Sequence, residues 1–177
     1  MTDEEKAATV ATVSAEALAV KAHEKLSRKS LDVDIIRNLS LYEEIAKMVE
    51  AVKKSPESNT EAITQAEQQL ESLKKDTISA TLVPLRAMDI LLVQGWVTEA
   101  AIQGKAMGFD FDVQLFVMSK AERAATAYLA LRKRSNPAER YFATQDEVAL
   151  LDDRTLREIA KLYSESFVLT EEERKNS

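Results

Sequence analysis

The sequence predicts an all-α fold, a bundle of long amphipathic helices that ends in a C-terminal subdomain of short helices. Glycine and proline, which interrupt helices, occur only three times each among the 177 residues. Apolar residues recur at steps of three and four positions along most of the chain, which is the period of one helix face. Long runs of alternating apolar and polar residues are lacking, so strands are not expected.

Residues 1–55 are expected to form two N-terminal helices. The first spans about residues 3–26, because Thr2 is a suitable N-cap and three acidic residues follow it. The second begins after Asp32 and ends near Lys54. Its apolar positions recur at helical spacing and are Ile35, Leu39, Tyr42, Ile45, Val49 and Val52.

Residues 58–135 are expected to form a central helical core, which follows a break at residues 53–60. A third helix begins there with apolar steps of three and four, the most regular heptad pattern in the chain. It is expected to kink or end near Leu82, because Pro84 removes a backbone hydrogen bond. Its apolar positions are Ile63, Ala66, Leu70, Leu73, Thr77 and Ala80.

Three more helices are expected in this core. One begins at Pro84 and ends near Gly95, a short one spans residues 98–107, and a long one spans about residues 111–134. Asp110 or Asp112 is expected to cap the long helix. The side chains expected inside are Leu85, Met88, Leu91, Leu92, Trp96, Phe109, Phe111, Val113, Phe116, Val117, Ala124, Ala127, Tyr128 and Leu131.

Residues 136–177 are expected to form the C-terminal subdomain of short helices. Three starts of helices carry capping residues, which bond the free backbone N–H groups of a first turn. These residues are Thr144 with Glu147, Asp152 or Asp153, and Thr170 with Glu173. The three parts of the chain could also form one continuous domain.

The composition limits the classes of function. A net charge of −6 argues against a general nucleic-acid or membrane-surface binder, which usually carries a basic field. The absence of cysteine excludes disulfide scaffolds, zinc–thiolate sites and cysteine nucleophiles, and it fits a cytoplasmic protein. The most apolar stretch, residues 78–97, contains Pro84, Arg86 and Asp89, so it is expected in a core and not in a membrane.

The sequence contains no recognisable catalytic, metal or cofactor site. His23 is the only histidine, so a di-metal centre built from two Glu-x-x-His motifs is excluded. The three glycines do not fit the spacing of a phosphate-binding loop. The acidic clusters lack the glycine and terminal glutamate of a calcium loop. We therefore expect a protein that is not an enzyme and has no cofactor.

A basic patch could make the protein a DNA-binding regulator. Its residues are Arg132, Lys133, Arg134 and Arg140. Such a patch either stabilises the carboxyl end of a helix or binds phosphate. Residues 155–166 also look like the first helix of a helix-turn-helix, although the segment that would read the DNA contains three glutamates. Nucleic-acid binding is therefore the alternative and not the preferred reading.

The segment RYFATQDEVALLDD and the helix expected after it carry a family resemblance. Phe142, Thr144, Asp146–Glu147, Val148 and Leu151 stand in the order F-x-T-x-D-E-V-x-x-L. Over about residues 138–168 the chain resembles the C-terminal part of tail assembly chaperones encoded by tailed bacteriophages. The resemblance implies a non-enzymatic role, in which such proteins coat the tape-measure protein and recruit tail-tube subunits.

We therefore expect an assembly or structural protein of bacteriophages that acts through helix–helix contacts. Its location would be the host cytoplasm or the virion, its partners would be phage structural or tail proteins, and a homo-oligomer is allowed. The residues expected at the partner interface are Ile63, Leu70, Leu73, Tyr141, Phe142, Val148 and Leu151.

Overall fold

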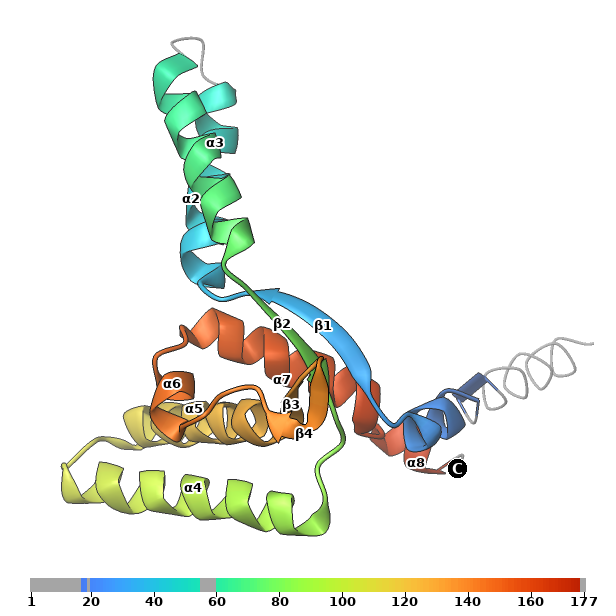
Figure 1. Ribbon diagram of the computed structural model, residues 1–177. Coiled ribbons are helices and arrows are strands. Elements are labelled where there is room, and N and C mark those ends of the chain that lie inside the picture. The colour runs from blue at the N-terminus through green and yellow to red at the C-terminus, as the bar shows by residue number, and fades with distance from the viewer. Residues whose placement is uncertain (1–16, 19, 55–59, 176–177) are drawn as a thin grey trace, which may run out of the picture.

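A computed structural model describes residues 17–18, 20–54 and 60–175, and it shows that the all-α prediction is wrong. Four strands form one antiparallel sheet in the order β1-β2-β3-β4. Two helical hairpins are inserted between consecutive strands, and three shorter helical elements follow the sheet (Figure 1). The fold is therefore a small helix-covered sheet with one hairpin projecting from it.

The first two strands replace parts of two expected helices. β1 (Leu31–Ile36) pairs with β2 (Thr77–Leu82), and between them lie α2 (Leu39–Lys53) and α3 (Thr60–Lys75). β1 alternates exposed aspartates with buried Val33 and Ile35, a period-two pattern too short to stand out against the helical spacing around it. Figure 1 shows α2 and α3 standing away from the sheet as a hairpin.

The second helical hairpin joins β2 to the other half of the sheet. It consists of α4 (Ala87–Ala106) and α5 (Phe111–Ala130), and α5 runs directly into β3 (Leu131–Lys133), which turns into β4 (Asn136–Arg140). The expected helix end near Gly95 is wrong, because α4 is continuous to residue 106.

The ends of this hairpin follow local backbone rules. Gly108 has a φ of 72° and turns the chain after α4, a conformation that glycine adopts without strain. The Asp110 side chain accepts a hydrogen bond of 2.9 Å from the Val113 N–H, so Asp110 is the cap of α5. Pro84 lies before the helix, which begins three residues later, at Ala87.

The C-terminal helices begin where their caps predict. They are α6 (Gln145–Ala149), α7 (Asp153–Phe167) and α8 (Glu171–Lys175). The Thr144 and Asp152 side chains cap α6 and α7. Thr170 and Glu173 bond each other's backbone N–H, which is the reciprocal pattern of a capping box.

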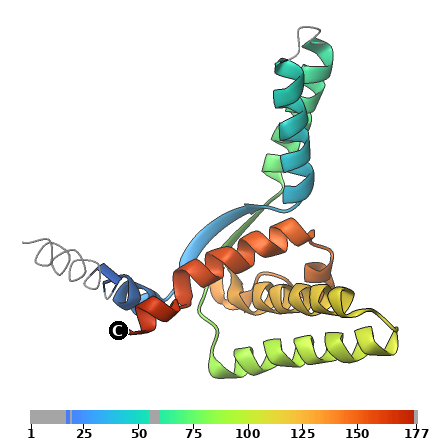
Figure 2. The same cartoon turned by 180° about the vertical axis from the view of Figure 1, so that it is seen from behind.

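One core joins all three predicted parts of the chain. The inner face of the sheet packs on α5 and α7, and α7 crosses in front of the strands in the rear view (Figure 2). The residues at its centre are Ile78, Leu82, Leu131, Val148, Leu156 and Ile159, each with no more than 2% of its surface exposed. The hydrophobic core therefore contains residues from each of the three parts that the sequence analysis separates.

The base of the α2–α3 hairpin is anchored to α7 by buried polar groups. The buried Thr155 hydroxyl oxygen lies 3.2 and 3.0 Å from the carbonyl oxygens of Ile36 and Arg37, and it accepts a hydrogen bond from the Leu39 N–H at 3.1 Å. Asp152 accepts hydrogen bonds from Thr155 and Ser40 at 2.7 Å each. These bonds fix the turn between β1 and α2.

The first helix expected from the sequence lies largely outside the described residues, as do residues 55–59 in the expected break. Residues 20–27 are helical, and the Lys25 ammonium lies 3.0 Å from the Glu173 carboxylate of α8. The chain's first described turns thus meet its last helix (Figure 1). Within the described ranges, none of the helices has the length and apolar content needed to traverse a bilayer.

Candidate partner-binding surfaces

The predicted basic patch does not form one surface of free charge. Lys133 lies 2.8 Å from Glu139, and Arg134 pairs with Asp34 at the same distance while also donating to the Val33 carbonyl. Pairing lowers the attraction that these two cations can offer a phosphate.

Arg132 and Arg140 lie elsewhere, as neighbours across β3 and β4. The Arg140 guanidinium stacks 4.5 Å above the ring of Tyr128. Burial lowers the pKa of the Arg132 guanidinium, Arg140 lowers it as well, and Asp89 acts in the opposite direction. An open cavity of about 880 Å³ adjoins Arg132 at the start of α4. These two arginines therefore form a separate, partly desolvated cationic group.

The predicted seam on α3 packs inside its own hairpin. Ile63, Leu70 and Leu73 are half-buried, and the facing helix α2 buries Ile45 and Val49. Lys53 and Glu67 add an exposed ion pair of 2.6 Å between the two helices. The seam thus already has a partner helix within the chain.

Three of the four C-terminal interface candidates belong to the core. Phe142, Val148 and Leu151 are at most 3% exposed, and Phe142 packs edge-to-face on Tyr141, which is half-buried. The sequence predicts them at a partner interface, whereas in the structure their side chains are buried in the core of the chain itself. The motif F-x-T-x-D-E-V-x-x-L is therefore, at these positions, a folding element whose apolar residues fill the core.

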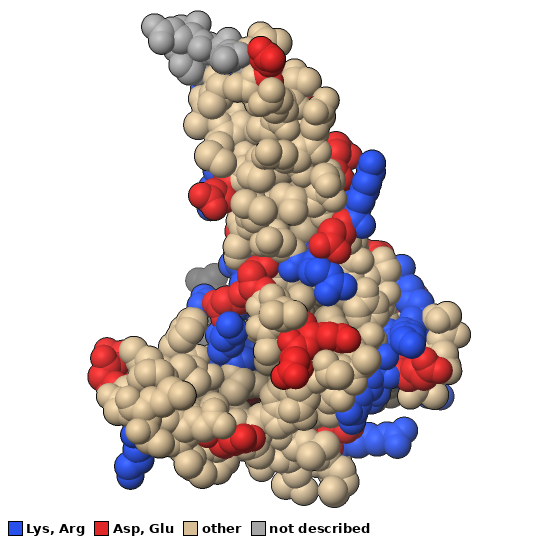
Figure 3. Space-filling model, turned by 60° about the vertical axis from the view of Figure 1, so that its left-hand side comes forward, with Lys and Arg blue, Asp and Glu red and all other residues tan. Residues whose placement is uncertain are grey.

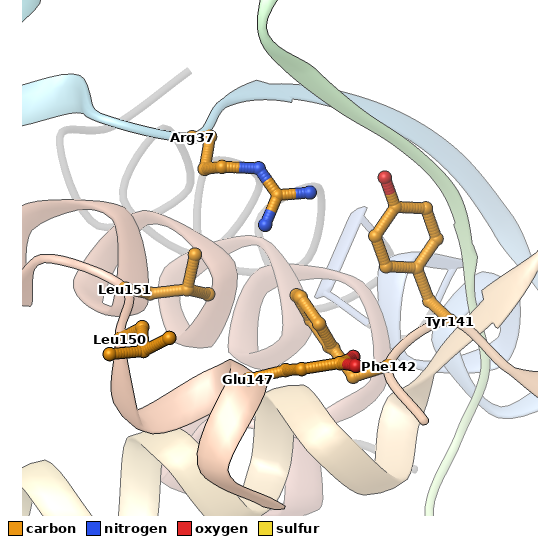
Figure 4. Close-up of a pocket in the computed structure, with 6 residues that line it drawn as sticks. All are labelled: Arg37, Tyr141, Phe142, Glu147, Leu150 and Leu151. Carbon is orange, nitrogen blue, oxygen red and sulfur yellow. The ribbon is translucent and has the colours of Figure 1, made fainter. Parts of the chain in front are cut away.

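A shallow pocket remains beside this element (Figure 4). It has a volume of about 480 Å³, and Arg37 and Tyr141 point into it from one side while Leu150 and Leu151 line the other. Glu147 accepts a hydrogen bond from the Ala143 N–H, and Arg37 pairs with Asp76, so both charges serve the fold. The residues described contain no group of three or more side chains able to hold a metal ion.

The surface that sequence reasoning missed is the α4–α5 hairpin. Of the eighteen large apolar side chains exposed in the described residues, eleven lie in this hairpin or its connecting turn. They are Met88, Ile90, Leu91, Leu92, Ile102, Met107, Phe109, Phe111, Val113, Leu115 and Phe116. In Figure 3, the lower part of the molecule shows mostly uncharged atoms with only scattered acidic and basic side chains.

Two regions of this surface are defined by their residues. The outer stripe lies on the side of α4 opposite to α5 and comprises Met88, Leu91, Leu92, Gly95 and Ile102. The hairpin end comprises Met107, Phe109, Phe111, Leu115 and Phe116. The sequence places seven of the exposed side chains of this hairpin inside, and those predictions are wrong; they are Met88, Leu91, Leu92, Phe109, Phe111, Val113 and Phe116.

The opposite face of α4 explains the error. Val93 packs on Ala125 and Leu129 of α5, and Trp96 stacks on Tyr128 with ring centres 5.9 Å apart. Apolar residues therefore occur on both sides of α4, and periodicity cannot tell which side the chain itself covers. A helix with apolar residues on all sides is usually buried on all sides. Because the outer side of α4 is exposed, we expect another protein surface to pack on it.

Comparison with protein-family models, curated proteins and solved structures gives no match to this chain.

Proposed function

We propose that this protein is a non-enzymatic assembly protein that binds partner proteins through helix–helix contacts on its α4–α5 hairpin. The observation that carries the proposal is the concentration of exposed apolar side chains on that hairpin. Together the eleven side chains expose on the order of 1,000 Å² of apolar surface, and the outer stripe alone has about the size of the largest patch on a typical monomer, about 300–600 Å², which is often functional. A surface of this size is typical of a protein-binding site.

The hairpin end suits a helical partner. Phe111 is 72% exposed, and the exposed Leu115 follows it at the spacing of one helical turn, with the exposed Phe116 beside Leu115. Large aromatic side chains supply much of the binding energy in interfaces when a partner desolvates them. A second amphipathic helix lying against the first turns of α5 would cover them.

We propose that the protein acts in the assembly of bacteriophage tails. The resemblance over about residues 138–168 supports it, and the partners would be the tape-measure and tail-tube proteins. The protein would then act in the host cytoplasm or be carried in the virion. The alternative, a DNA-binding regulator, draws little support, because the helix that would read DNA, α8, has five residues and three glutamates in its first turn.

Co-expression tests the proposal. The tagged protein is produced together with the tape-measure and tail-tube proteins of a tailed bacteriophage, and the retained proteins are quantified. Phe111→Asp combined with Leu115→Asp should reduce retention roughly tenfold or more, because charges replace the apolar contact. Leu150→Asp is the matched control, since Leu150 is 86% exposed but lies outside the hairpin.

Equal retention by the double variant and the control would contradict the proposal, as would the failure of the wild type to retain either protein. Circular dichroism of each variant confirms that a loss is not due to unfolding, which is not expected at such exposed positions.

A further inference from the structure

We infer that the outer stripe of α4 packs against the outer stripe of a second copy of this chain, antiparallel, about a two-fold axis at Gly95. The inference rests on the proposed function, because it names the occupant of one part of the hairpin surface. It leaves the hairpin end free for other proteins. Four observations lead to the second copy as occupant.

The first observation is the spacing of the stripe. Its residues follow one another at positions i, i+3, i+4, i+7 and i+14 from Met88, so they share one face of a straight helix. Met88, Leu91 and Ile102 are each more than half exposed. This face has the geometry of a helix-packing seam, yet no described element of the chain covers it.

The second observation is Gly95 itself, which lies in the interior of the 20-residue helix α4. An interior glycine destabilises a helix by about 1 kcal/mol relative to alanine. No positive φ requires it, and a Cβ added there would meet no atom within 4 Å. No described part of the chain comes close enough to Gly95 to exclude a side chain. A second helix that crosses α4 at short range would exclude one.

The third observation is the symmetry of the stripe. Met88 and Ile102 lie seven residues before and after Gly95. An antiparallel two-fold axis at Gly95 therefore places Met88 of one copy opposite Ile102 of the other, twice. It also places Leu92 opposite Thr98, and Leu91 opposite Glu99. A two-fold interface must be self-complementary in this way.

The fourth observation is the charge at the stripe, whose apolar positions are bordered by Glu99 and, near the end of α4, by Lys105. A parallel pair in register would set Glu99 against Glu99. The antiparallel pair separates the two carboxylates by eight residues, about 12 Å along the axis, which exceeds the Debye length of about 8 Å at physiological salt. Charge thus selects the antiparallel arrangement.

The area agrees with a dimer of ordinary size. The four large side chains of the stripe expose on the order of 450 Å² of apolar surface. A standard interface buries about 800 Å² per partner, of which about 57% is apolar. The stripe therefore supplies about the apolar area that a stable pair requires.

Single-cysteine cross-linking of the full chain tests the inference, and the absence of native cysteine makes it clean. Gly95→Cys should form a disulfide-linked dimer rapidly under mild oxidation, because the axis brings the two residues together. Gln94→Cys is the matched control, since its side chain points about 100° away around the helix and should cross-link at least roughly tenfold more slowly.

Light scattering during size-exclusion chromatography supplies a second readout. The wild type should have the mass of a dimer, and Gly95→Leu should raise the dissociation constant roughly 100-fold or more, because a bulky side chain separates the helices. The Gly95→Leu monomer should fold and melt at least as high as the wild type at equal low concentration.

A wild type that is monomeric at 100 times the working concentration of about 1 μM, or a Gly95→Leu variant that remains dimeric, would overturn the inference. So would equal cross-linking at the two cysteine positions, which indicates random collision or a different occupant. If the dimer fails while partner retention still depends on Phe111 and Leu115, the proposed function stands and only the second copy is wrong.

Discussion

The two helical hairpins of this protein occupy equivalent places in the chain, since each is inserted between consecutive antiparallel strands. They differ in how many of their apolar side chains are buried within the chain. In the α2–α3 hairpin, one apolar face per helix turns inward and packs on the other helix. In the α4–α5 hairpin, α4 is apolar on both its inner and outer faces. The first hairpin exposes three large apolar side chains, Leu41, Met48 and Val52, whereas the second exposes eleven and is the one for which we propose a partner.

The difference shows that amphipathic spacing alone does not identify a binding surface. The heptad pattern of α3 is the most regular in the sequence, and it is used inside the molecule. The surplus of apolar residues on α4 is less regular, and it faces outward. We propose α4 as the binding helix because it has more apolar residues than its own fold covers.

The largest effect on the free energy of unfolding is expected when a charge is placed on the inner face of α4 and compared with a charge on its outer face. Val93→Asp places a charge in the buried contact with α5 and should lower the free energy of unfolding by more than about 3 kcal/mol. Leu91→Asp, on the outer stripe, should change it by less than about 0.5 kcal/mol in dilute solution. Denaturant titrations of both variants measure the contrast. A similar loss from both would mean that the outer stripe is covered within the monomer.

A smaller loss is expected in the α2–α3 hairpin. Leu70→Asp disturbs a half-buried contact and should cost about 2 kcal/mol, mostly by loosening the hairpin. Hydrogen exchange should accelerate in residues 60–75 and not in α5. The mass of the assembled protein should stay unchanged, because this hairpin exposes far fewer large apolar side chains than the α4–α5 hairpin does. A changed mass would place an interface on α3 and remove the contrast between the hairpins.

The anchor of the first hairpin should respond to pH. Burial acts to raise the pKa of Asp152, but hydrogen bonds from Ser40 and Thr155 outweigh it, so the pKa lies below its ordinary value. A carboxyl whose pKa is lowered on folding stabilises the protein above its unfolded value of about 3.9, and this contribution is lost as pH falls through the folded value.

Asp152→Asn tests the anchor, because it removes the charge of the carboxylate but keeps a side-chain oxygen that can cap α7. It should cost about 1 kcal/mol at neutral pH and should flatten the loss of stability below about pH 4. Thermal unfolding between pH 7 and pH 3 measures both. A variant with the same acid-dependent loss as the wild type would show that other carboxyls control it.

The smallest effect is expected from the ion pair between α2 and α3. Lys53 and Glu67 are each about half exposed, so Glu67→Gln should change stability by about 0–0.5 kcal/mol. Melting curves at low and high salt should differ little between the variant and the wild type. A loss above 1 kcal/mol would mean that charge, and not the apolar seam, holds this hairpin together.

Local features were predictable from the sequence, and long-range ones were not. Asp110, Thr144 and Thr170 cap helices as predicted, because a cap depends on three or four neighbouring residues. β1 and β2 pair residue 31 with residue 82, and neither strand is long enough for its alternation to outweigh the helical spacing on either side. β3 has three residues and continues directly from α5, so it carries no sequence signal of its own.

The candidate surface was hidden for a related reason. Sequence spacing places Leu91 and Val93 in the same apolar helix, but only the position of α5 decides that Val93 is inside and Leu91 outside. Gly95 was expected to end the helix, and its place in the middle of the exposed stripe becomes visible only once α4 is seen to be continuous. The sequence did contain one indication of this surface, because α4 has apolar residues on both of its faces.

The central claim is that the α4–α5 hairpin, and not the α2–α3 hairpin, binds other proteins. Hydrogen–deuterium exchange of the protein alone and with the retained partner tests it most directly. The account predicts slower exchange in residues 87–119 and unchanged exchange in residues 39–53 and 60–75. Slower exchange confined to the α2–α3 hairpin, or no change in either hairpin, would contradict it.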